Sequence, residues 1–121
     1  MSFRKIGVIG AGAWGTALAQ VCVRAGLDTL LQAREPALAE AMRETRLNDP
    51  YLPGVTLAPG MRFTADMADL SGCDLILAVP PAQHMRGALA AFAPHARPEV
   101  PIVLCSKGIE ASSGRLMNHV A

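Results

Sequence analysis

The hydrophobic pattern changes its period within the first 26 residues, and this change restricts the fold more than any other feature of the chain. Residues 5–9 (KIGVI), apolar after Lys5, are typical of a short buried strand. From Trp14 onward the apolar residues recur with the i, i+3, i+4 spacing of a helix, which Gly26 would end. The side chains predicted to face the sheet are Trp14, Ala17, Leu18, Val21, Cys22 and Ala25.

A glycine-rich turn, residues 10–15 (GAGAWG), joins this strand to this helix. In such a turn Gly10 allows a tight bend, Gly12 lets a diphosphate approach the backbone, and Gly15 allows the helix to pack closely on the strand. The free N–H groups of a helix that begins near Ala13 favour bound phosphate. The segment therefore predicts a dinucleotide-binding turn, and a glycine turn without a ligand is the alternative.

Strands and helices alternate along the rest of the chain, with a turn-rich segment at residues 48–54. The apolar runs at 74–79 and 100–105 are typical of strands that are buried in a parallel sheet. The alternation predicts an α/β fold of the Rossmann type, with a doubly wound, mainly parallel sheet, and one NAD(P)-binding domain over residues 1–121. Further strands are expected over residues 28–33, 55–57 and 62–64, and helices over 36–46, 66–70 and 85–92 and after Ser112 or Ser113.

Four segments follow predicted strands and should meet at one edge of the sheet, where ligands collect in open α/β folds. They are the glycine turn, Arg34, Pro80-Pro81 and Lys107. Arg34 is placed to pair with the 2′-phosphate of NADP(H), whereas the neighbouring Glu35 would weaken that preference. We therefore expect NADP(H) to be favoured over NAD(H). The alternative for Arg34 is a solvated arginine at a helix start, and the alternative for Lys107 is a lysine on a surface loop.

The charge of the chain excludes some partners. It has 11 Lys and Arg against 10 Asp and Glu, and a formal net charge of +1 gives no basic field for nucleic acid. Residues 6–23 are uncharged and follow Arg4-Lys5, as in a signal peptide or a membrane span. The glycines, Gln20 and the change of period argue against both. We expect no nucleic-acid partner and no membrane span.

Cys22, Cys73 and Cys105 are widely spaced and include no Cys-x-x-Cys pair. This spacing predicts neither a disulfide framework nor a zinc site, and the 3 His residues show no ligand spacing either. Scattered thiols of this kind fit a reducing compartment. We therefore expect buried thiols, no bound metal and a cytoplasmic protein.

Four motifs occur in order: residues 10–19 (GAGAWGTALA), residues 48–55 (NDPYLPGV), Ala78-Val79-Pro80 with Arg86, and residues 106–110 (SKGIE). Together they resemble the bacterial glycerol-3-phosphate dehydrogenase [NAD(P)+] family over essentially the whole chain. The resemblance implies an oxidoreductase that interconverts two small molecules, sn-glycerol 3-phosphate and dihydroxyacetone phosphate, and supplies phospholipid synthesis in the cytoplasm.

The same resemblance implies roles for four residues. Trp14 and Arg34 would contact NADPH, and Tyr51 would lie near the cofactor. Lys107 would contact both the cofactor and glycerol 3-phosphate. The chain departs from the family at Ala13 (often Ser), Gln32 (often Trp), Glu35 (often basic) and Pro81 (often Ser or Thr).

The length of 121 residues is short for this family, whose general acid/base lysine and most substrate contacts lie in a helical C-terminal domain. We therefore expect an N-terminal fragment that binds NADP(H), contains no catalytic residue and does not turn over the substrate. A sheet that lacks its last strands would expose an edge, which favours association, for example as a homodimer. Two alternatives stay open: a related NADP-dependent reductase of the 6-phosphogluconate or ketopantoate type, and a non-catalytic dinucleotide-sensing module.

Overall fold

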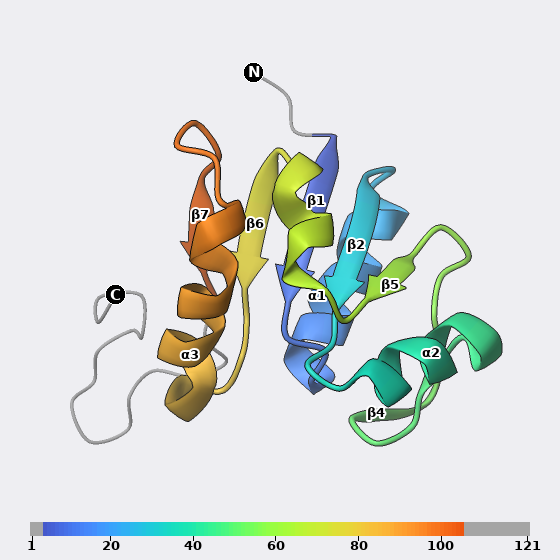
Figure 1. The fold of residues 1–121 in the computed structure, drawn as a ribbon. Coiled ribbons are helices and arrows are strands. Elements are labelled where there is room, and N and C mark those ends of the chain that lie inside the picture. Colours follow the sequence, from blue (N-terminus) through green and yellow to red (C-terminus); the bar gives the residue numbers. More distant parts are fainter. Residues whose placement is uncertain (1–3, 106–121) are drawn as a thin grey trace, which may run out of the picture.

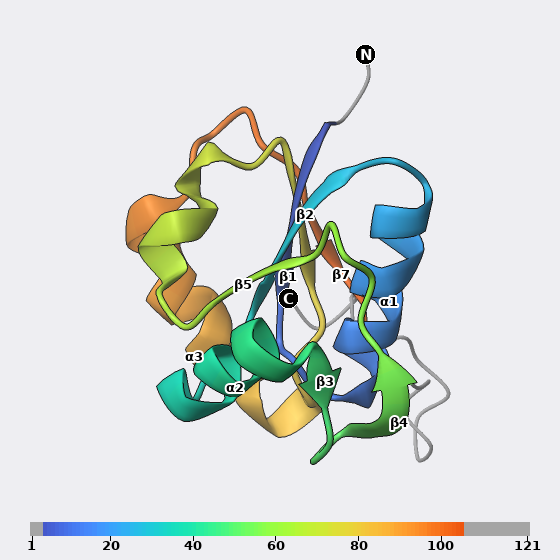
Figure 2. The ribbon, with the colours of Figure 1, turned by 90° about the vertical axis from the view of Figure 1, so that its right-hand side faces the viewer.

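The computed structural model of the chain describes residues 4–105. In chain order the elements are β1 (Lys5–Ile9), α1 (Ala13–Arg24), β2 (Asp28–Gln32), α2 (Pro36–Thr45), β3 (Leu47–Asn48), β4 (Leu52–Thr56), β5 (Arg62–Thr64), the 3-10 helix η1 (Met67–Gly72), β6 (Leu75–Ala78), α3 (Ala82–Phe92), the 3-10 helix η2 (Ala93–His95) and β7 (Ile102–Leu104). A parallel sheet with the order β5-β2-β1-β6-β7 lies between α1 on one face and α3 with η1 on the other (Figures 1 and 2). The predicted Rossmann-type α/β fold is confirmed.

β1 lies in the middle of the sheet and pairs with β2 on one side and β6 on the other. Ile9 is opposite both Gln32 and Ala78, so the three strands end level with one another. Ile6 and Val8 pack in the apolar cluster that includes α1, whereas Ile9 packs in the cluster that includes η1 and α3. β1 is therefore buried on both faces, as its uninterrupted apolar sequence predicts.

The buried face of α1 agrees only in part with the predicted one: Leu18 and Cys22 pack against the core as expected, but the fully buried positions are others. Its buried residues are Gly15, Thr16, Ala19 and Gln20. Trp14 and Val21, which were expected to face the sheet, are 42% and 62% exposed. Gly15 and Ala19 face the sheet because their small size lets the helix backbone approach the strands. The polar groups of Thr16 and Gln20 are acceptable there because each takes part in hydrogen bonds.

Gly15 and Gly10 make the close approach of α1 to the turn sterically allowed. A Cβ atom at Gly15 would overlap the carbonyl oxygen of Gly10. Gly10 has a φ of +105°, and a Cβ atom there would lie 2.9 Å from the backbone nitrogen of Pro80. Among the described residues, nothing lies within 4 Å of a Cβ atom added at Gly12. Packing therefore requires glycine at positions 10 and 15 but leaves position 12 open.

Residues 48–54, predicted as a turn-rich segment, belong largely to an antiparallel hairpin. Leu47 pairs with Thr56 and Asn48 pairs with Leu52, with an irregular register between them. β4 contains Pro53 and Gly54, which the sequence analysis took as turn residues. A two-stranded ladder tolerates them because most of its backbone groups lie on open edges.

Among the described residues β7 is an exposed edge strand, which agrees with the expected exposed edge of a sheet that lacks its last strands but not with the buried strand expected over residues 100–105. Ile102 is 39% exposed and Val103 is 45% exposed. Within the described part of the chain β7 pairs with β6 alone. An apolar run indicates that a strand can be buried, but it carries no information about the position of the strand in the sheet.

Other predicted elements are confirmed with small shifts of their ends. The Asp66 side chain accepts a hydrogen bond from the backbone N–H of Ala68 at 2.9 Å and so caps η1. The predicted apolar stripe of α3 buries Met85 and Phe92. Within residues 4–105, no helix combines the length and the apolar character that a membrane crossing needs. The helix expected after Ser112 or Ser113 lies outside the described residues.

Substitution by alanine should change the stability of the fold more at Gly15, which is closely packed, than at Gly12, which is not. Gly15→Ala should lower the free energy of unfolding by at least about 2 kcal/mol, because the new methyl group must displace the Gly10 carbonyl. Gly12→Ala, in the same turn, should change it by less than about 1 kcal/mol. Urea unfolding followed by circular dichroism measures both values, and equal stabilities of the two variants would contradict the close packing of α1.

Candidate functional site

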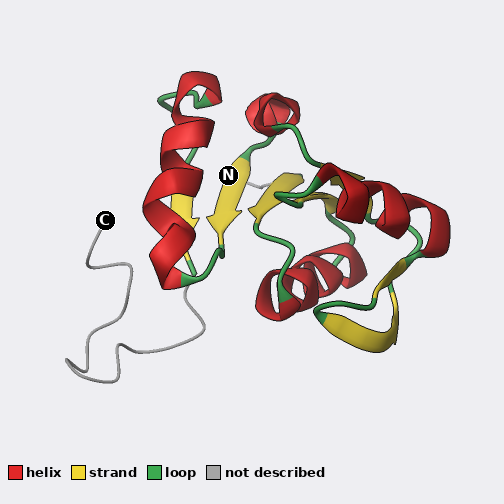
Figure 3. Ribbon diagram, turned by 60° about the horizontal axis from the view of Figure 1, so that its bottom comes forward, coloured by secondary structure: helices red, strands yellow, loops and turns green. Residues whose placement is uncertain are grey.

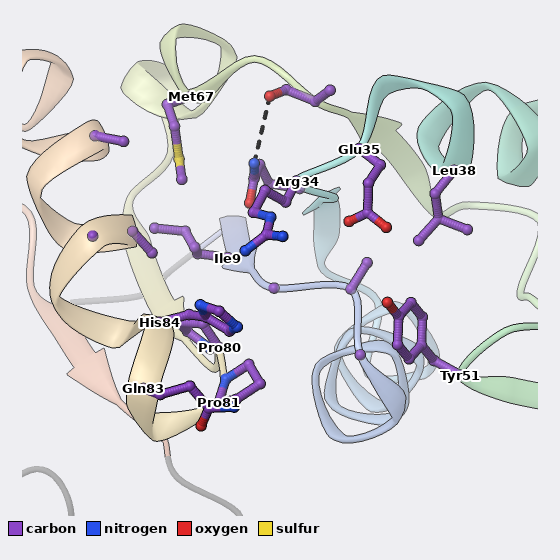
Figure 4. Close-up of a pocket in the computed structure, with 18 residues that line it drawn as sticks. Ile9, Arg34, Glu35, Leu38, Tyr51, Met67, Pro80, Pro81, Gln83 and His84 are labelled. Atoms are coloured by element: carbon purple, nitrogen blue, oxygen red, sulfur yellow. Dashed lines mark hydrogen bonds between the residues drawn. The ribbon is translucent and has the colours of Figure 1, made fainter.

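A cavity of about 560 Å³ lies at the carboxyl ends of β1, β2 and β6. This volume is within the roughly 300–1,000 Å³ that is typical of small-molecule sites. The chain order reverses here, because β2 extends the sheet on one side of β1 and β6 on the other. Figure 3 brings this edge of the sheet forward, and Figure 4 shows the lining side chains. Ligands of open α/β sheets bind at such a reversal.

The start of α1 and the turn before it form one wall of the cavity, with Gly10, Ala11 and Gly12 in the lining. Gly12 is the N-cap residue, and no side chain in the described part of the chain caps the helix. The first turn also contains no acidic residue. The helix therefore offers N–H donors and the positive end of its dipole, and the free space at Gly12 leaves room for an anion. A phosphate group fits this arrangement.

Arg34 and Glu35 follow β2 and form the next part of the wall. In Figure 4 the Arg34 guanidinium is directed toward Ile9 at the end of β1, and the Glu35 carboxylate is directed toward Tyr51. Both residues are exposed. A guanidinium suits an anionic group of a ligand, whereas a carboxylate suits hydroxyl donors and repels anions.

Gln32 lines this part of the cavity and connects two neighbouring segments. The side chain is 4% exposed, and its Nε2 donates hydrogen bonds to the carbonyl oxygens of Ala33 at 3.2 Å and Ala65 at 3.4 Å. The bond to Ala65 is the dashed line in Figure 4. It ties the end of β2 to the segment that follows β5.

The connection between β6 and α3 forms the opposite wall. Pro80 is buried, while Gln83 and His84 on the first turn of α3 face the cavity across from Tyr51 and Leu38 (Figure 4). Sequence reasoning did not place His84 and Leu38 in a site. Their position depends on how α3 and α2 pack on the sheet, and no local motif signals it.

The structure brings most of the predicted cofactor-binding residues to one cavity. Its lining includes Gly10, Gly12, Arg34, Tyr51 and Pro80. Ala13 and Trp14 are exposed at the start of α1 but are not among the described lining residues, and Gly15 is buried under the turn. Lys107 lies outside the described residues. The cofactor-binding roles of all these residues, including those that line the cavity, stay predictions.

Asn48 belongs to the site although the sequence indicated it only as part of a motif. It is 0% exposed, and its Nδ2 donates hydrogen bonds to the Ala11 carbonyl and to Thr16 Oγ1, both at 2.8 Å. Its own carbonyl accepts a hydrogen bond from the backbone N–H of Tyr51 at 3.2 Å. Asn48 thus connects the hairpin that carries Tyr51 to the glycine turn.

The thiols lie away from this chemistry. Cys73 is buried as expected, whereas Cys22 and Cys105 are only partly buried. Burial raises the pKa of Cys22, Cys73 and Cys105, and the neighbouring Cys105 raises that of Cys22 further. A raised pKa disfavours the reactive thiolate at neutral pH, so none of the thiols is set up as a nucleophile. Within residues 4–105, no three His, Cys, Asp or Glu side chains come together as a metal site would require.

Comparisons with known proteins agree with this geometry. Residues 5–121 match the family model described as NAD-dependent glycerol-3-phosphate dehydrogenase N-terminus. The chain is 61% identical over 121 residues to glycerol-3-phosphate dehydrogenase [NAD(P)+] of Caulobacter vibrioides, a match that covers 100% of this chain and 37% of that protein. It superimposes on glycerol-3-phosphate dehydrogenase from Coxiella burnetii with a TM-score of 0.82 and 30% identity, covering 97% of this chain and 36% of that one.

The chain therefore spans little more than a third of the length of these relatives. A ketopantoate reductase from Ralstonia eutropha has a TM-score of 0.70 over 92% of this chain and 37% of its own, but at 21% identity it shows a shared fold alone. Against the alternative of a related reductase of the 6-phosphogluconate or ketopantoate type, which the sequence left open, the family match favours the glycerol-3-phosphate dehydrogenases.

The thiol chemistry gives a test of the geometry. In the folded chain at pH 7, Cys73 should react with an alkylating reagent at least about tenfold more slowly than in urea, because burial raises its pKa and restricts access. Timed labelling followed by mass spectrometry of the Cys73 peptide measures both rates, with the unfolded chain as the control. Equal rates would show that Cys73 is not buried as described.

Proposed function

The chain belongs to the NAD-dependent glycerol-3-phosphate dehydrogenase N-terminal family, and from this membership we propose that residues 1–121 form the NAD(P)-binding domain, with the dinucleotide in the cavity at the carboxyl ends of β1, β2 and β6. The observation that carries the proposal is the uncapped start of α1 beside Gly12, which borders the same cavity as Arg34. A dinucleotide supplies a diphosphate for the helix start and a ribose for the end of β2.

We assign the diphosphate to the turn of Gly10 and Gly12 and to the N–H groups from Ala13 onward. Gly15 contributes through packing, because it lets α1 lie against the turn. Pro80 follows β6, where the nicotinamide half of a dinucleotide lies in folds of this type. The supporting observation is that the helix start and the β6–α3 connection border one continuous cavity.

Three further assignments draw on the family resemblance. Tyr51 lines the cavity and would pack against the cofactor. Trp14 is 42% exposed beside the helix start, so its contact requires a ligand that extends past the cavity over the first turn of α1. We assign Lys107 to both the cofactor and the substrate.

We propose that the site prefers NADP(H) to NAD(H). The Arg34 guanidinium lies after β2, where the adenosine ribose is held in dinucleotide-binding folds, and can form paired hydrogen bonds with a 2′-phosphate. Glu35 lines the cavity beside it and repels the same phosphate, which limits the preference.

For the complete protein we propose reduction of dihydroxyacetone phosphate to sn-glycerol 3-phosphate, in support of glycerophospholipid synthesis. The names of the relatives and the four ordered motifs support this activity. The cofactor supplies the hydride, and the residues of this chain bind and orient it. The carbonyl oxygen also needs a proton donor, and we assign that role to no residue of this chain.

We also propose a cytoplasmic location and a homodimer. Three free thiols with raised pKa values suit a reducing compartment. The exposed apolar residues Ile102 and Val103 on the edge strand β7 support association with another chain.

Binding of NADPH should depend on the absence of a side chain at Gly12. Gly12→Ala should weaken NADPH at least about tenfold, because its methyl group would occupy the space that the diphosphate needs. Gly72→Ala is the matched control: Gly72 ends η1, lies outside the cavity, and also has no described atom within 4 Å of an added Cβ. Calorimetric titration measures the affinities, and no binding by the wild type, or equal binding by Gly12→Ala, would sink the proposal.

The preference for NADP(H) should reside in Arg34. Loss of charge-assisted hydrogen bonds worth about 2 kcal/mol predicts that Arg34→Ala weakens NADPH about thirtyfold and NADH less than threefold. Arg24→Ala, which removes an exposed arginine from the other end of α1, should leave both affinities unchanged. Fluorescence titration of each variant with both cofactors gives the ratio, and equal wild-type affinities for NADPH and NADH would remove the claim.

A further inference from the structure

Asn48 is a fully buried polar residue whose type the packing of the core does not explain. Its Nδ2 faces the Ala11 carbonyl and Thr16 Oγ1, both at 2.8 Å. A carbonyl oxygen only accepts hydrogen bonds, so the group that faces Ala11 must be a donor. In the described part of the chain Oδ1 has no partner. Because an unpaired buried amide oxygen costs free energy, the favourable interactions of this side chain come from its Nδ2.

The donor acts on the middle of the glycine turn. Ala11 lies between Gly10 and Gly12, and its carbonyl shares a trans peptide plane with the Gly12 N–H. In a trans peptide the C=O and the N–H point in opposite directions. A carbonyl held toward Asn48 therefore turns the Gly12 N–H away from the buried side, and Gly12 itself lines the cavity.

The same residue is joined to the hairpin wall of the cavity. The backbone N–H of Tyr51 donates to the Asn48 carbonyl at 3.2 Å, and Tyr51 lines the cavity. Figure 2 shows the β3–β4 hairpin beside the start of α1. The main chain of Asn48 therefore bonds to the hairpin turn that carries Tyr51, and its side chain bonds to the glycine turn that would hold the diphosphate.

We infer that Asn48 is a positioning residue for cofactor binding. Through the Ala11 carbonyl it orients the Gly12 N–H toward the diphosphate, and it fixes the hairpin that carries Tyr51 to the same turn. This inference rests on the proposed function. Because the diphosphate is common to NADPH and NADH, Asn48 must affect both cofactors by the same factor. Arg34, by contrast, acts on the 2′-phosphate and changes their ratio.

Gln20 offers a matched control because it also joins α1 to the segment that follows the hairpin. Its Nε2 donates to the Thr56 carbonyl at 3.1 Å, and its Oε1 accepts from the Ala58 N–H at 2.8 Å. It is 6% exposed, as a buried structural residue would be. Gln20 lies beyond the first turn of α1, and its hydrogen bonds in the described structure go to Thr56 and Ala58 rather than to Ala11.

The test compares Asn48→Leu, Asn48→Ala and Gln20→Ala in the full 121-residue chain. Leu keeps the approximate volume of Asn and removes the donor, whereas Ala removes both. Both Asn48 variants should bind NADPH and NADH about tenfold more weakly, with an unchanged ratio between the two cofactors. Gln20→Ala should lose thermal stability but keep both affinities within about twofold. Calorimetric titration well below the melting temperature gives the affinities.

A second measurement uses the wild-type chain and applies even where a variant does not fold. In a ¹⁵N NMR titration with NADH, the side-chain amide signals of Asn48 should shift on binding, and those of Gln20 should not.

The outcomes distinguish the proposed function from the positioning role of Asn48. Absence of cofactor binding by the wild type would overturn the proposed function itself. Wild-type binding together with full affinity in Asn48→Leu, equal losses in Asn48→Leu and Gln20→Ala, or unmoved Asn48 amide signals would overturn the positioning role alone.

Discussion

The close approach of α1 to the turn after β1 is the constraint on which the rest of the site depends. Gly15 has no room for a Cβ atom beside the Gly10 carbonyl, so the helix start is held directly at the end of the central strand. This contact places the N–H groups of the helix at the cavity edge rather than over the sheet. It also explains why two glycines of one motif serve packing while Gly12 leaves open space for a ligand.

Buried polar side chains complete what the glycine packing begins. Asn48 and Gln20 join α1 to the β3–β4 hairpin and the segment after it through hydrogen bonds that span more than thirty residues of sequence. Such bonds have directional requirements that apolar contacts lack, and an unpaired partner would be costly in the interior. Of these two side chains, Asn48 is the one that bonds to the glycine turn, so it holds the hairpin wall of the cavity in one position relative to that turn and preorganises the site before a ligand binds, whereas Gln20 contributes to the stability of the fold.

The sequence predicted the features that depend on local pattern. The strand, glycine turn and helix, the Rossmann-type sheet and the position of Arg34 at the end of β2 all follow from spacing along the chain. The predictions from sequence were wrong where contacts between distant segments determine which side chains are buried. The exposed Trp14 shows that the apolar stripe alone does not define the face of α1 that lies on the sheet, although Leu18 and Cys22 of that stripe do pack against the core. The partners of Asn48 and the position of His84 arise from contacts between distant segments, which no local pattern contains.

We propose above all that a nicotinamide dinucleotide binds in the cavity at the carboxyl ends of β1, β2 and β6, against the start of α1. Hydrogen–deuterium exchange of the wild-type chain with and without NADPH tests it most directly. The account predicts slower exchange in residues 10–16, 34–38 and 47–56 when NADPH is bound, and no change in residues 97–104. Protection that leaves the glycine turn unchanged, or that appears only in the remote segment 97–104, would contradict it.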